Sequence, residues 1–328
     1  MGYFVAEPRP RTGVVAIGRN DGERLRRCLL SLQGSGCPIV YVDSDSNDGS
    51  RDAATKLGTL VVPLDLSLPF TAARARAEGF AALNSSHADL ETVFFVDGDC
   101  EVEEGFLANA GLFLVEHPDF AVVCGRRRER FPDASRYNRL IDREWDTAVG
   151  ETTACGGDAL IRISAYREAG GFDPRMLAGE EPELCARLRR KGWRIMRIDA
   201  PMTIHDAAMY RFSQWWRRAI RSGMGYAQAW SVTRHGEGAG LYQKELLRAL
   251  IWAGALPLIG FALAMLVSPV LILFWPGLTG LQFVRLAVRN GTFASFLSII
   301  GKYAELTGIT RFAMRRLLGR VGSTVTYK

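Results

Sequence analysis

Residues 93–106 have the sequence VFFVDGDCEVEEGF, an apolar run that ends in a dense group of carboxylates. Carboxylates this close repel one another, and a neighbouring cation offsets that repulsion. Asp97 and Asp99 flank a single glycine, so their oxygens can hold a hard divalent ion such as Mg²⁺ or Mn²⁺. Such an ion can bridge the oxygens of a diphosphate and neutralise a phosphate leaving group. The glutamates that follow are expected to begin the next helix and face water: Glu101, Glu103 and Glu104.

An Asp-Gly-Asp turn is also common in ordinary loops, so the elements around it must support the metal interpretation. Apolar, β-branched runs at residues 13–21, 38–50, 59–65 and 92–99 predict strands, with helical patterns between them. This alternation is typical of a doubly wound parallel sheet, in which ligands gather at the carboxyl ends of the strands. Polar clusters lie at three of these ends and are expected to meet at one edge: Arg19 to Asp21, Asp43 to Asp48, and Asp97 to Asp99.

The middle of the chain contains a glycine pair, a strand-like run and a short helix within residues 154–176. Residues 179–195 predict a further helix, because acids open it and Arg, Lys and Gly close it. Glu180 and Glu181 are the first of these acids, and interaction with the helix dipole and with Arg187 would explain them without any catalytic role. Residues 211–230 then form an aromatic, arginine-rich amphipathic segment.

The stretch from Ala249 to Val284 contains no charged residue and is longer than the roughly 20 residues that one membrane-spanning helix needs. Prolines interrupt it, which favours two short helices folded as a hairpin over one straight span. The alternative is a buried helical hairpin in a soluble protein. Basic residues flank both ends and favour the cytoplasmic side for both: Lys244, Arg248, Arg285 and Arg289. Further arginines predict an amphipathic helix on the membrane surface: Arg311, Arg315, Arg316 and Arg320.

Composition narrows the class of protein. The net charge of the 328 residues is +6, and a basic, apolar C-terminal part suggests an anionic membrane surface in place of nucleic acid. Zinc-finger spacing, a basic zipper and an RNA-binding aromatic pattern are lacking. The six cysteines form no CxxC pair, which favours reduced, buried thiols in a cytosolic compartment. A dinucleotide-binding dehydrogenase would need GxGxxG after the first strand, and IGRNDG does not provide it.

Taken together, the motifs resemble family-2 glycosyltransferases with the GT-A fold. The matching segments cover residues 13 to about 206 in the family's order: VVAIGRNDGERLRRCL, VYVDSDSNDGS, ARARAEGF, VFFVDGDCEV, ACGGDALIRISAYREAGGFDPRM and GEEPELCARLRRKGW. The resemblance implies an α/β GT-A fold, Rossmann-like, with a mostly parallel sheet and flanking helices, followed by a C-terminal helical membrane-associated region. It also implies an inverting hexosyltransferase that takes a sugar from a nucleotide-sugar donor.

The resemblance assigns nucleotide-sugar-binding roles to residues at the strand ends and beyond. Arg76 matches a family arginine that faces the base or the diphosphate, although a solvated helix face is the alternative. Gly157 and Asp158 match a loop between donor and acceptor, where a small residue lets the backbone approach the sugar. The chain has Asp45 where the family often has another residue. The remaining assigned residues are Ile17, Arg19, Asn20, Asp43, Asp97 and Gly98.

The resemblance also implies a metal site and a general base. Asp99 is the stronger metal ligand beside Asp97, and His205 stands where many such enzymes complete the metal shell, although a core histidine is the alternative. The cofactor is then Mg²⁺ or Mn²⁺. The second acid of the pair Glu180 and Glu181 removes the proton of the acceptor hydroxyl. Because the family commonly has Asp there, the choice stays open among three residues: Glu180, Glu181 and Glu183.

These inferences combine into one functional prediction. A transferase domain spans 1–210, amphipathic connecting helices span 211–245, and the hydrophobic hairpin with a basic helix spans 246–328. The expected donor is a nucleotide-diphosphate sugar, with UDP-sugars favoured, and the acceptor is a lipid-linked or cell-surface glycan in cell-envelope polysaccharide biosynthesis. The expected location is the cytoplasmic face of the inner (plasma) membrane, without nucleic acid as a partner. A sugar nucleotidyltransferase and a non-catalytic membrane scaffold with a degenerate transferase domain are the alternatives.

Overall fold

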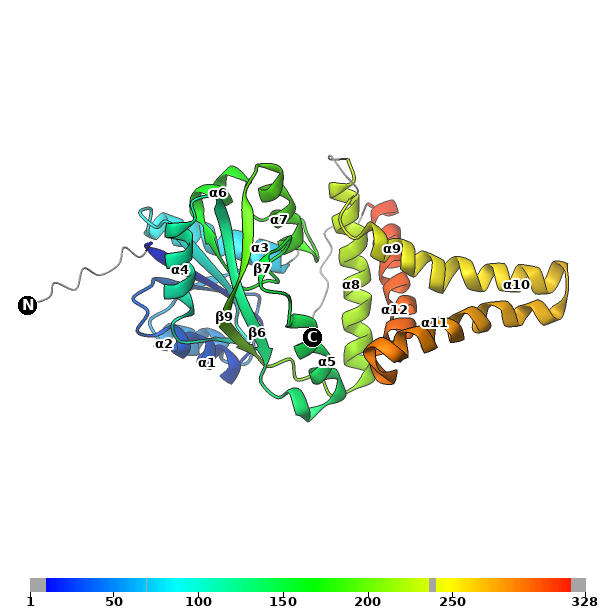
Figure 1. Cartoon of the computed structure of the whole chain (residues 1–328). Helices are drawn as coiled ribbons and strands as arrows, with labels where there is room; N and C mark the ends of the chain where they lie inside the picture. Colours follow the sequence, from blue (N-terminus) through cyan, green and yellow to red (C-terminus); the bar gives the residue numbers. More distant parts are fainter. Residues whose placement is uncertain (1–9, 69, 236–239, 320–328) are drawn as a thin grey trace, which may run out of the picture. The chain divides into compact units, whose positions relative to one another are not determined.

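The computed structural model describes residues 10–68, 70–235 and 240–319. The chain forms two compact units, one ending at Tyr210 and the other beginning at Arg211 (Figure 1). Every described strand lies in the first unit, and the described part of the second unit is helical. Each unit is treated separately below.

Four strands of the first unit are parallel and alternate with helices. In chain order these are β1 (Thr12–Gly18), α1 (Glu23–Leu32), β2 (Ile39–Asp43), α2 (Ser50–Lys56), β3 (Leu60–Pro63), α3 (Ala72–Ser86) and β4 (Thr92–Asp97). Their order in space is β3-β2-β1-β4. This half of the sheet confirms the predicted strand–helix alternation.

The other half of the sheet is mixed, so the expectation of a mostly parallel sheet is wrong there. β8 (Ala159–Arg162) is antiparallel to β4 and to β6 (Phe120–Glu129), and β6 is parallel to β9 (Arg194–His205). β5 (Cys100–Val102) and β7 (Gly150–Glu151) both pair antiparallel with β9. The described strands make one nine-stranded sheet in the order β3-β2-β1-β4-β8-β6-β9-β5, with β7 beside β9.

The expectation that the glutamates after the Asp-Gly-Asp turn begin the next helix is wrong, and the expectation that they face water is wrong for two of the three. Glu101 lies in strand β5 between two buried residues, a period-two pattern that marks a strand. It pairs with the guanidinium groups of Arg27 and Arg130, and Glu103 pairs with Arg128. The next helix, α4 (Phe106–Glu116), begins after all three glutamates. Only Glu104 is exposed, as expected.

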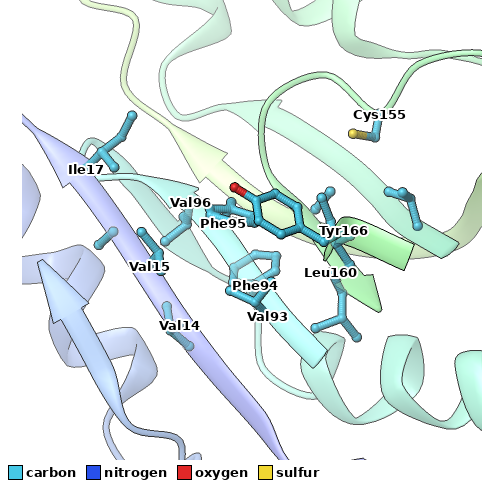
Figure 2. Packing of buried hydrophobic residues seen from close by; sticks show 14 of the residues in the cluster. Val14, Val15, Ile17, Val93, Phe94, Phe95, Val96, Cys155, Leu160 and Tyr166 are labelled. Atoms are coloured by element: carbon cyan, nitrogen blue, oxygen red, sulfur yellow. The ribbon is translucent and has the colours of Figure 1, made fainter. Parts of the chain in front are cut away.

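The core of the first unit lies around β1 and β4. Both strands are buried on both faces, which explains their continuous apolar sequences. Figure 2 shows Phe94 and Phe95 of β4 beside Val14 and Val15 of β1. The Phe95 ring also packs at 5.5 Å from Tyr166 and edge-on at 5.1 Å from Phe172. This packing holds the carboxyl ends of β1 and β4 in place, and it therefore also positions the polar residues that follow these strands.

The remaining helices of the first unit are a 3₁₀ turn (Pro132–Ala134), α5 (Arg136–Trp145), α6 (Ile163–Glu168) and α7 (Glu180–Arg190). The second unit contains α8 (Phe212–Thr233), α9 (Gln243–Ala249), a π-helical turn (Leu250–Ala255), α10 (Leu256–Leu266), a 3₁₀ turn (Pro269–Leu273), α11 (Phe274–Asn290) and α12 (Thr292–Leu317). Arg311, Arg315 and Arg316 lie on α12, and Arg320 falls outside the described residues.

The apolar stretch forms two long helical segments, Gln243–Leu266 and Pro269–Asn290, so the expectation of two short helices is wrong. Pro257 and Pro276 lie inside these two segments, just after the π-helical turn and the 3₁₀ turn, where the hydrogen-bond pattern of the helix already changes. The chain breaks instead beside Ser268. By length and composition both segments could cross a membrane, and their most apolar windows are only 17% and 0% buried. The two segments are therefore not buried within the described part of this chain.

Helices α8 and α12 cross with their backbones in contact. A Cβ atom on Gly308 would lie 2.0 Å from the carbonyl oxygen of Ile220, and one on Gly223 would lie 2.1 Å from that of Glu305. Only glycine allows this approach. Trp215 packs against the same helix at Gly301. The described second unit therefore rests on a glycine-lined helix crossing.

Gly308→Ala should lower the melting temperature of the detergent-solubilised protein, because the added Cβ forces α8 and α12 apart. We expect a loss of about 1–3 kcal/mol, the usual cost of overpacking. Gly280→Ala in α11 is the matched control, since its Cβ would meet nothing within 4 Å. Both changes gain the same helix propensity, so their difference isolates the crossing. Unfolding of Gly308→Ala at or above the wild-type temperature would contradict this packing.

Candidate active site

The three polar clusters meet at one edge of the sheet, as the sequence predicts. Gly18 and Asp43 are register partners on β1 and β2, and Ile17 and Asp97 are partners on β1 and β4. The N–H of Gly98 donates to the Ile17 carbonyl oxygen at 2.7 Å. These backbone pairs hold the loops after β1, β2 and β4 side by side.

Asp97 lies between two arginines. Its Oδ1 accepts from Arg76 at 2.7 Å and its Oδ2 from Arg127 at 3.2 Å. Burial would raise the pKa of the Asp97 carboxyl, but the two guanidinium groups outweigh it and hold the pKa below its usual value. Arg76 is only 2% exposed, so the alternative of a solvated helix face is wrong. The carboxylate is thus ionised and fixed in position.

Asp158 lies beneath this pair and is fully buried. Its Oδ1 accepts from the backbone N–H of Asp97 at 3.0 Å, and its Oδ2 accepts from Arg127 Nε at 2.9 Å and Thr203 Oγ1 at 2.8 Å. Both oxygens are therefore occupied by protein donors. Asp158 therefore holds Asp97 and Arg127 in position, and its contact with a nucleotide sugar stays a prediction.

Arg127 is the main residue that sequence reasoning missed. It lies on β6 inside a run of arginines, RRRER at 126–130, and only the sheet decides which of them points inward. Its guanidinium contacts Asp97 and Asp158 and lies 5.4 Å from the ring centre of Trp145. The alternation of side chains in a strand was the available signal, but register shifts on both sides of Arg126 interrupt it.

Gly157 leaves space above the arginines. Its φ of 100° is unfavourable for any residue with a side chain. A Cβ there would lie 3.6 Å from Arg127, 3.7 Å from Arg76 and 3.8 Å from Asp97. The loop therefore passes close to the charged groups without covering them with a side chain.

Asp99 and His205 lie together although they are far apart in the sequence. Antiparallel pairing of β5 with β9 makes Cys100 and His205 register partners, and His205 Nε2 lies 3.4 Å from Asp99 Oδ1. The imidazole stacks edge-on against Trp145 at 4.7 Å. The neighbouring Cys100 is fully buried, and its sulfur is a soft ligand that hard divalent ions disfavour. The remaining donors, a carboxylate and an imidazole, fit Mn²⁺ or Mg²⁺.

The loop after β2 is organised by Asp43, which is fully buried. Its carboxylate accepts from Ser46 N at 2.9 Å, Tyr41 Oη at 3.1 Å and Arg51 Nε at 2.7 Å. Burial would raise the pKa of Asp43, but these hydrogen bonds outweigh it and lower the pKa. Asp43 therefore shapes the loop from below.

Arg19, Asn20 and Asp45 lie on the loops that follow β1 and β2. Asn20 and Asp45 adopt left-handed backbone angles, with φ of 54° and 70°. Arg19 lies 4.6 Å from the centre of the Phe70 ring and 3.8 Å from Asp45. Ile17 is nearly buried. A planar guanidinium over an aromatic ring offers a flat, cationic wall to a ligand.

The three acids that open α7 have different partners. Glu180 pairs with Arg76 at 2.5 Å, and Glu183 pairs with Arg187 through both of its oxygens. Glu181 points elsewhere and accepts from the backbone N–H of Cys155 and from the Cys185 thiol. The proposed interaction with Arg187 therefore belongs to Glu183. Glu181 has neutral donors as its described partners.

The profile described as "Glycosyl transferase family 2" matches residues 14–216. Succinoglycan biosynthesis protein ExoA of Rhizobium meliloti (strain 1021) is 26% identical over 234 residues, which cover 67% of this chain and 68% of that protein. Pre-mycofactocin glycosyltransferase of Mycobacterium tuberculosis (strain ATCC 25618 / H37Rv) is 31% identical over 228 residues, 62% of this chain but only 45% of that protein.

A solved structure has a similar fold. Mannosyltransferase PcManGT from Pyrobaculum calidifontis, in complex with GDP-Man and Mn²⁺, superposes with a TM-score of 0.65 at 19% identity. The match covers 94% of this chain and 88% of that one. The expected GT-A fold with additional C-terminal helices is thereby confirmed.

Proposed function

Because the chain belongs to glycosyl transferase family 2, we propose that it moves a hexose, with inversion, from a nucleotide-diphosphate sugar to a lipid-linked or cell-surface glycan acceptor. Membership of a glycosyltransferase family leaves the sugar nucleotidyltransferase and the non-catalytic scaffold without support. The observation that carries the proposal is the group of Asp97, Arg76 and Arg127 beside Asp99 and His205.

Within that group, Asp99 and His205 would hold the divalent metal, with Asp97 beside them. The metal supplies charge neutralisation for the departing nucleoside diphosphate. Asp97 already shares both oxygens with arginines, which supports Asp99 as the more direct ligand. Arg76 and Arg127 present fixed guanidinium groups that suit phosphate oxygens. PcManGT was solved with Mn²⁺, which is consistent with this assignment.

Nucleotide binding is proposed at the loops after β1 and β2. Arg19, Asn20 and Asp45 would contact the base and ribose, and the buried Asp43 would hold their loop in shape. A UDP-sugar remains the predicted donor. PcManGT carries GDP-Man, so GDP-sugars belong in any test.

Glu181 is proposed as the general base that takes the proton of the acceptor hydroxyl. Glu180 and Glu183 are each committed to an arginine, and a carboxylate held by a guanidinium is a weaker proton acceptor. Glu180 then has a different role: it holds Arg76 from the side opposite Asp97.

The proposed site of action is the cytoplasmic face of the plasma membrane. The two apolar segments are exposed and long enough to span a bilayer as a pair. Such a pair would return the chain to the side on which Lys244, Arg248 and Arg289 lie. The relative ExoA is named for succinoglycan biosynthesis, which supports a polysaccharide acceptor.

The test is a transfer assay on membranes that contain the protein. UDP- and GDP-sugars are supplied in turn, and transfer to the lipid and glycan fractions is measured before EDTA, after EDTA, and after Mn²⁺ or Mg²⁺ is returned. We expect one donor class to support transfer, EDTA to abolish it, and metal to restore it. Activity should sediment with membranes. Transfer that is indifferent to EDTA would overturn the metal site, and no transfer from any donor would overturn the proposed reaction.

A further inference from the structure

A second group of metal-binding side chains lies beside α7, outside the Asp99–His205 pair. Cys155 on the loop before β8 and Cys185 on α7 lie with their Sγ atoms 3.7 Å apart. The Cys185 Sγ also lies 3.1 Å from Glu181 Oε1. One ligand atom from each of the three residues falls within 4.8 Å of the others. Figure 2 shows Cys155 on a loop beside the packed core.

The spacing of these atoms matches a tetrahedral metal site. Zn–S bonds of about 2.3 Å at the tetrahedral angle place two sulfurs about 3.8 Å apart, close to the observed 3.7 Å. A Zn–O bond of about 2.0 Å places sulfur and oxygen roughly 3.5 Å apart, a few tenths of an ångström beyond the observed 3.1 Å. Two of the three ligand pairs therefore already lie close to the spacing of a tetrahedral site, and the third pair lies within 4.8 Å.

The chemistry of the donors selects a soft cation. Two thiols and one carboxylate are the ligand types of zinc sites, whereas Mg²⁺ and Mn²⁺ favour oxygen. The contact from Cys185 lowers the pKa of the Cys155 thiol, but burial and the Glu181 carboxylate outweigh it and raise the pKa to about 11. The thiols are thus protonated and neutral until a cation displaces their protons.

We propose that Cys155, Cys185 and Glu181 bind a zinc-class divalent cation, and that this cation inhibits sugar transfer by occupying the general base. The binding depends only on the three side chains, whereas the inhibition rests on the proposed function of Glu181. The three ligands are buried, and Cys155 lies next to the exposed Gly156 of the same loop. The enzyme then has two chemically distinct sites: a hard one that supports transfer and a soft one that stops it.

Cobalt(II) provides a direct readout of binding, because tetrahedral cobalt–thiolate coordination absorbs visible light far more strongly than octahedral oxygen coordination. The reduced, full-length protein in detergent is titrated with Co²⁺ and then with Zn²⁺. We expect the wild type to develop these bands with one equivalent of Co²⁺ and to lose them to Zn²⁺. Cys155→Ser and Cys185→Ser should each lose the bands. Both keep a neutral donor to Glu181, since the Cys155 contact is a backbone N–H and serine retains a hydroxyl at 185.

Cys37→Ser is the matched control, because Cys37 is half-buried and hydrogen-bonds only locally, to Ser35. It should keep the cobalt bands. Bands that are absent in the wild type, or unchanged in both Cys155→Ser and Cys185→Ser, would overturn the site. Loss of two titratable thiols through a disulfide, without cobalt bands, would overturn it as well. Should either serine variant fail to fold, Cys185→Ala replaces it with the same expected loss.

Inhibition is measured separately, with saturating Mn²⁺ and increasing Zn²⁺. We expect the wild type and Cys37→Ser to be inhibited at a Zn²⁺ concentration at least about 10-fold lower than Cys185→Ser, because loss of even an outer partner of a metal ligand lowers metal affinity by about 10–100-fold. Equal inhibition of all three would mean that zinc acts at Asp99 and His205, and would overturn the inhibitory role. Cobalt binding without any transferase activity would instead retain the site and refute the proposed function.

Discussion

Asp99→Asn should reduce sugar transfer by more than about 100-fold, because it removes the charged ligand from the proposed hard-metal site. Outer partners of metal ligands already contribute about 10–100-fold, and a direct ligand should contribute more. Asparagine keeps the size of the side chain and its contact distance to His205, which is 3.4 Å in the wild type. The loss should therefore come from charge and metal affinity, with the fold intact.

The measurement is the rate of transfer against Mn²⁺ concentration, together with direct Mn²⁺ binding. We expect Asp99→Asn to need far more Mn²⁺ and to regain part of its activity when the ion is abundant. Glu104→Gln is the matched control, since Glu104 is exposed and belongs to the same acidic stretch. It should transfer sugar at the wild-type rate. Wild-type activity and Mn²⁺ affinity in Asp99→Asn would place the metal elsewhere.

Glu181→Gln should lower kcat by about 10²–10⁴-fold, the usual contribution of a general base, while donor affinity stays the same. Glutamine retains the oxygen that accepts from the Cys155 N–H, so the loop keeps its anchor. The loss should be confined to the chemical step. Donor binding by calorimetry and kcat from transfer assays separate the two effects.

Two companion variants sharpen this result. Glu181→Asp keeps a carboxylate with a shorter reach and should recover part of the activity lost in Glu181→Gln. Glu180→Gln removes the partner of Arg76, so it should weaken donor binding more than it lowers kcat. A normal kcat in Glu181→Gln would assign the base to another residue. Equal losses in the glutamine and aspartate variants would indicate a packing role for Glu181.

Local sequence patterns were sufficient to predict much of the secondary structure of the first unit. Buried strands such as β4 are continuous apolar runs, and turn residues follow them directly. The position of Asp97 and Asp99 at a strand end therefore follows from the neighbouring residues alone. The pairing of later strands does not, because β8 runs antiparallel between two other strands through contacts remote in sequence. Strand direction depends on such partners, which no local window contains.

The C-terminal helices also separate what the local sequence predicts from what depends on remote contacts. Hydropathy identifies the apolar stretch, but the prolines within it wrongly predict that its helices are short. Pro257 and Pro276 instead lie inside continuous helical segments, just after a π-helical turn and a 3₁₀ turn, where the hydrogen-bond pattern of the helix already changes. Gly223 and Gly308 carried no local signal at all. Their importance follows from a crossing that brings two backbones within contact distance.

The sequence by itself determined the chemistry that is present: the carboxylate pair after β4, the acids that open α7, and the apolar helices. It did so because charge, apolar runs and turn residues act over a few positions. Only the tertiary structure decided which of these groups meet. His205 reaches Asp99 through the pairing of β5 with β9, and Arg127 points at Asp97 because of its position on β6. Neighbouring acids on α7 point in different directions, since successive helical residues are about 100° apart, and their distinct partners separate Glu180 from Glu181.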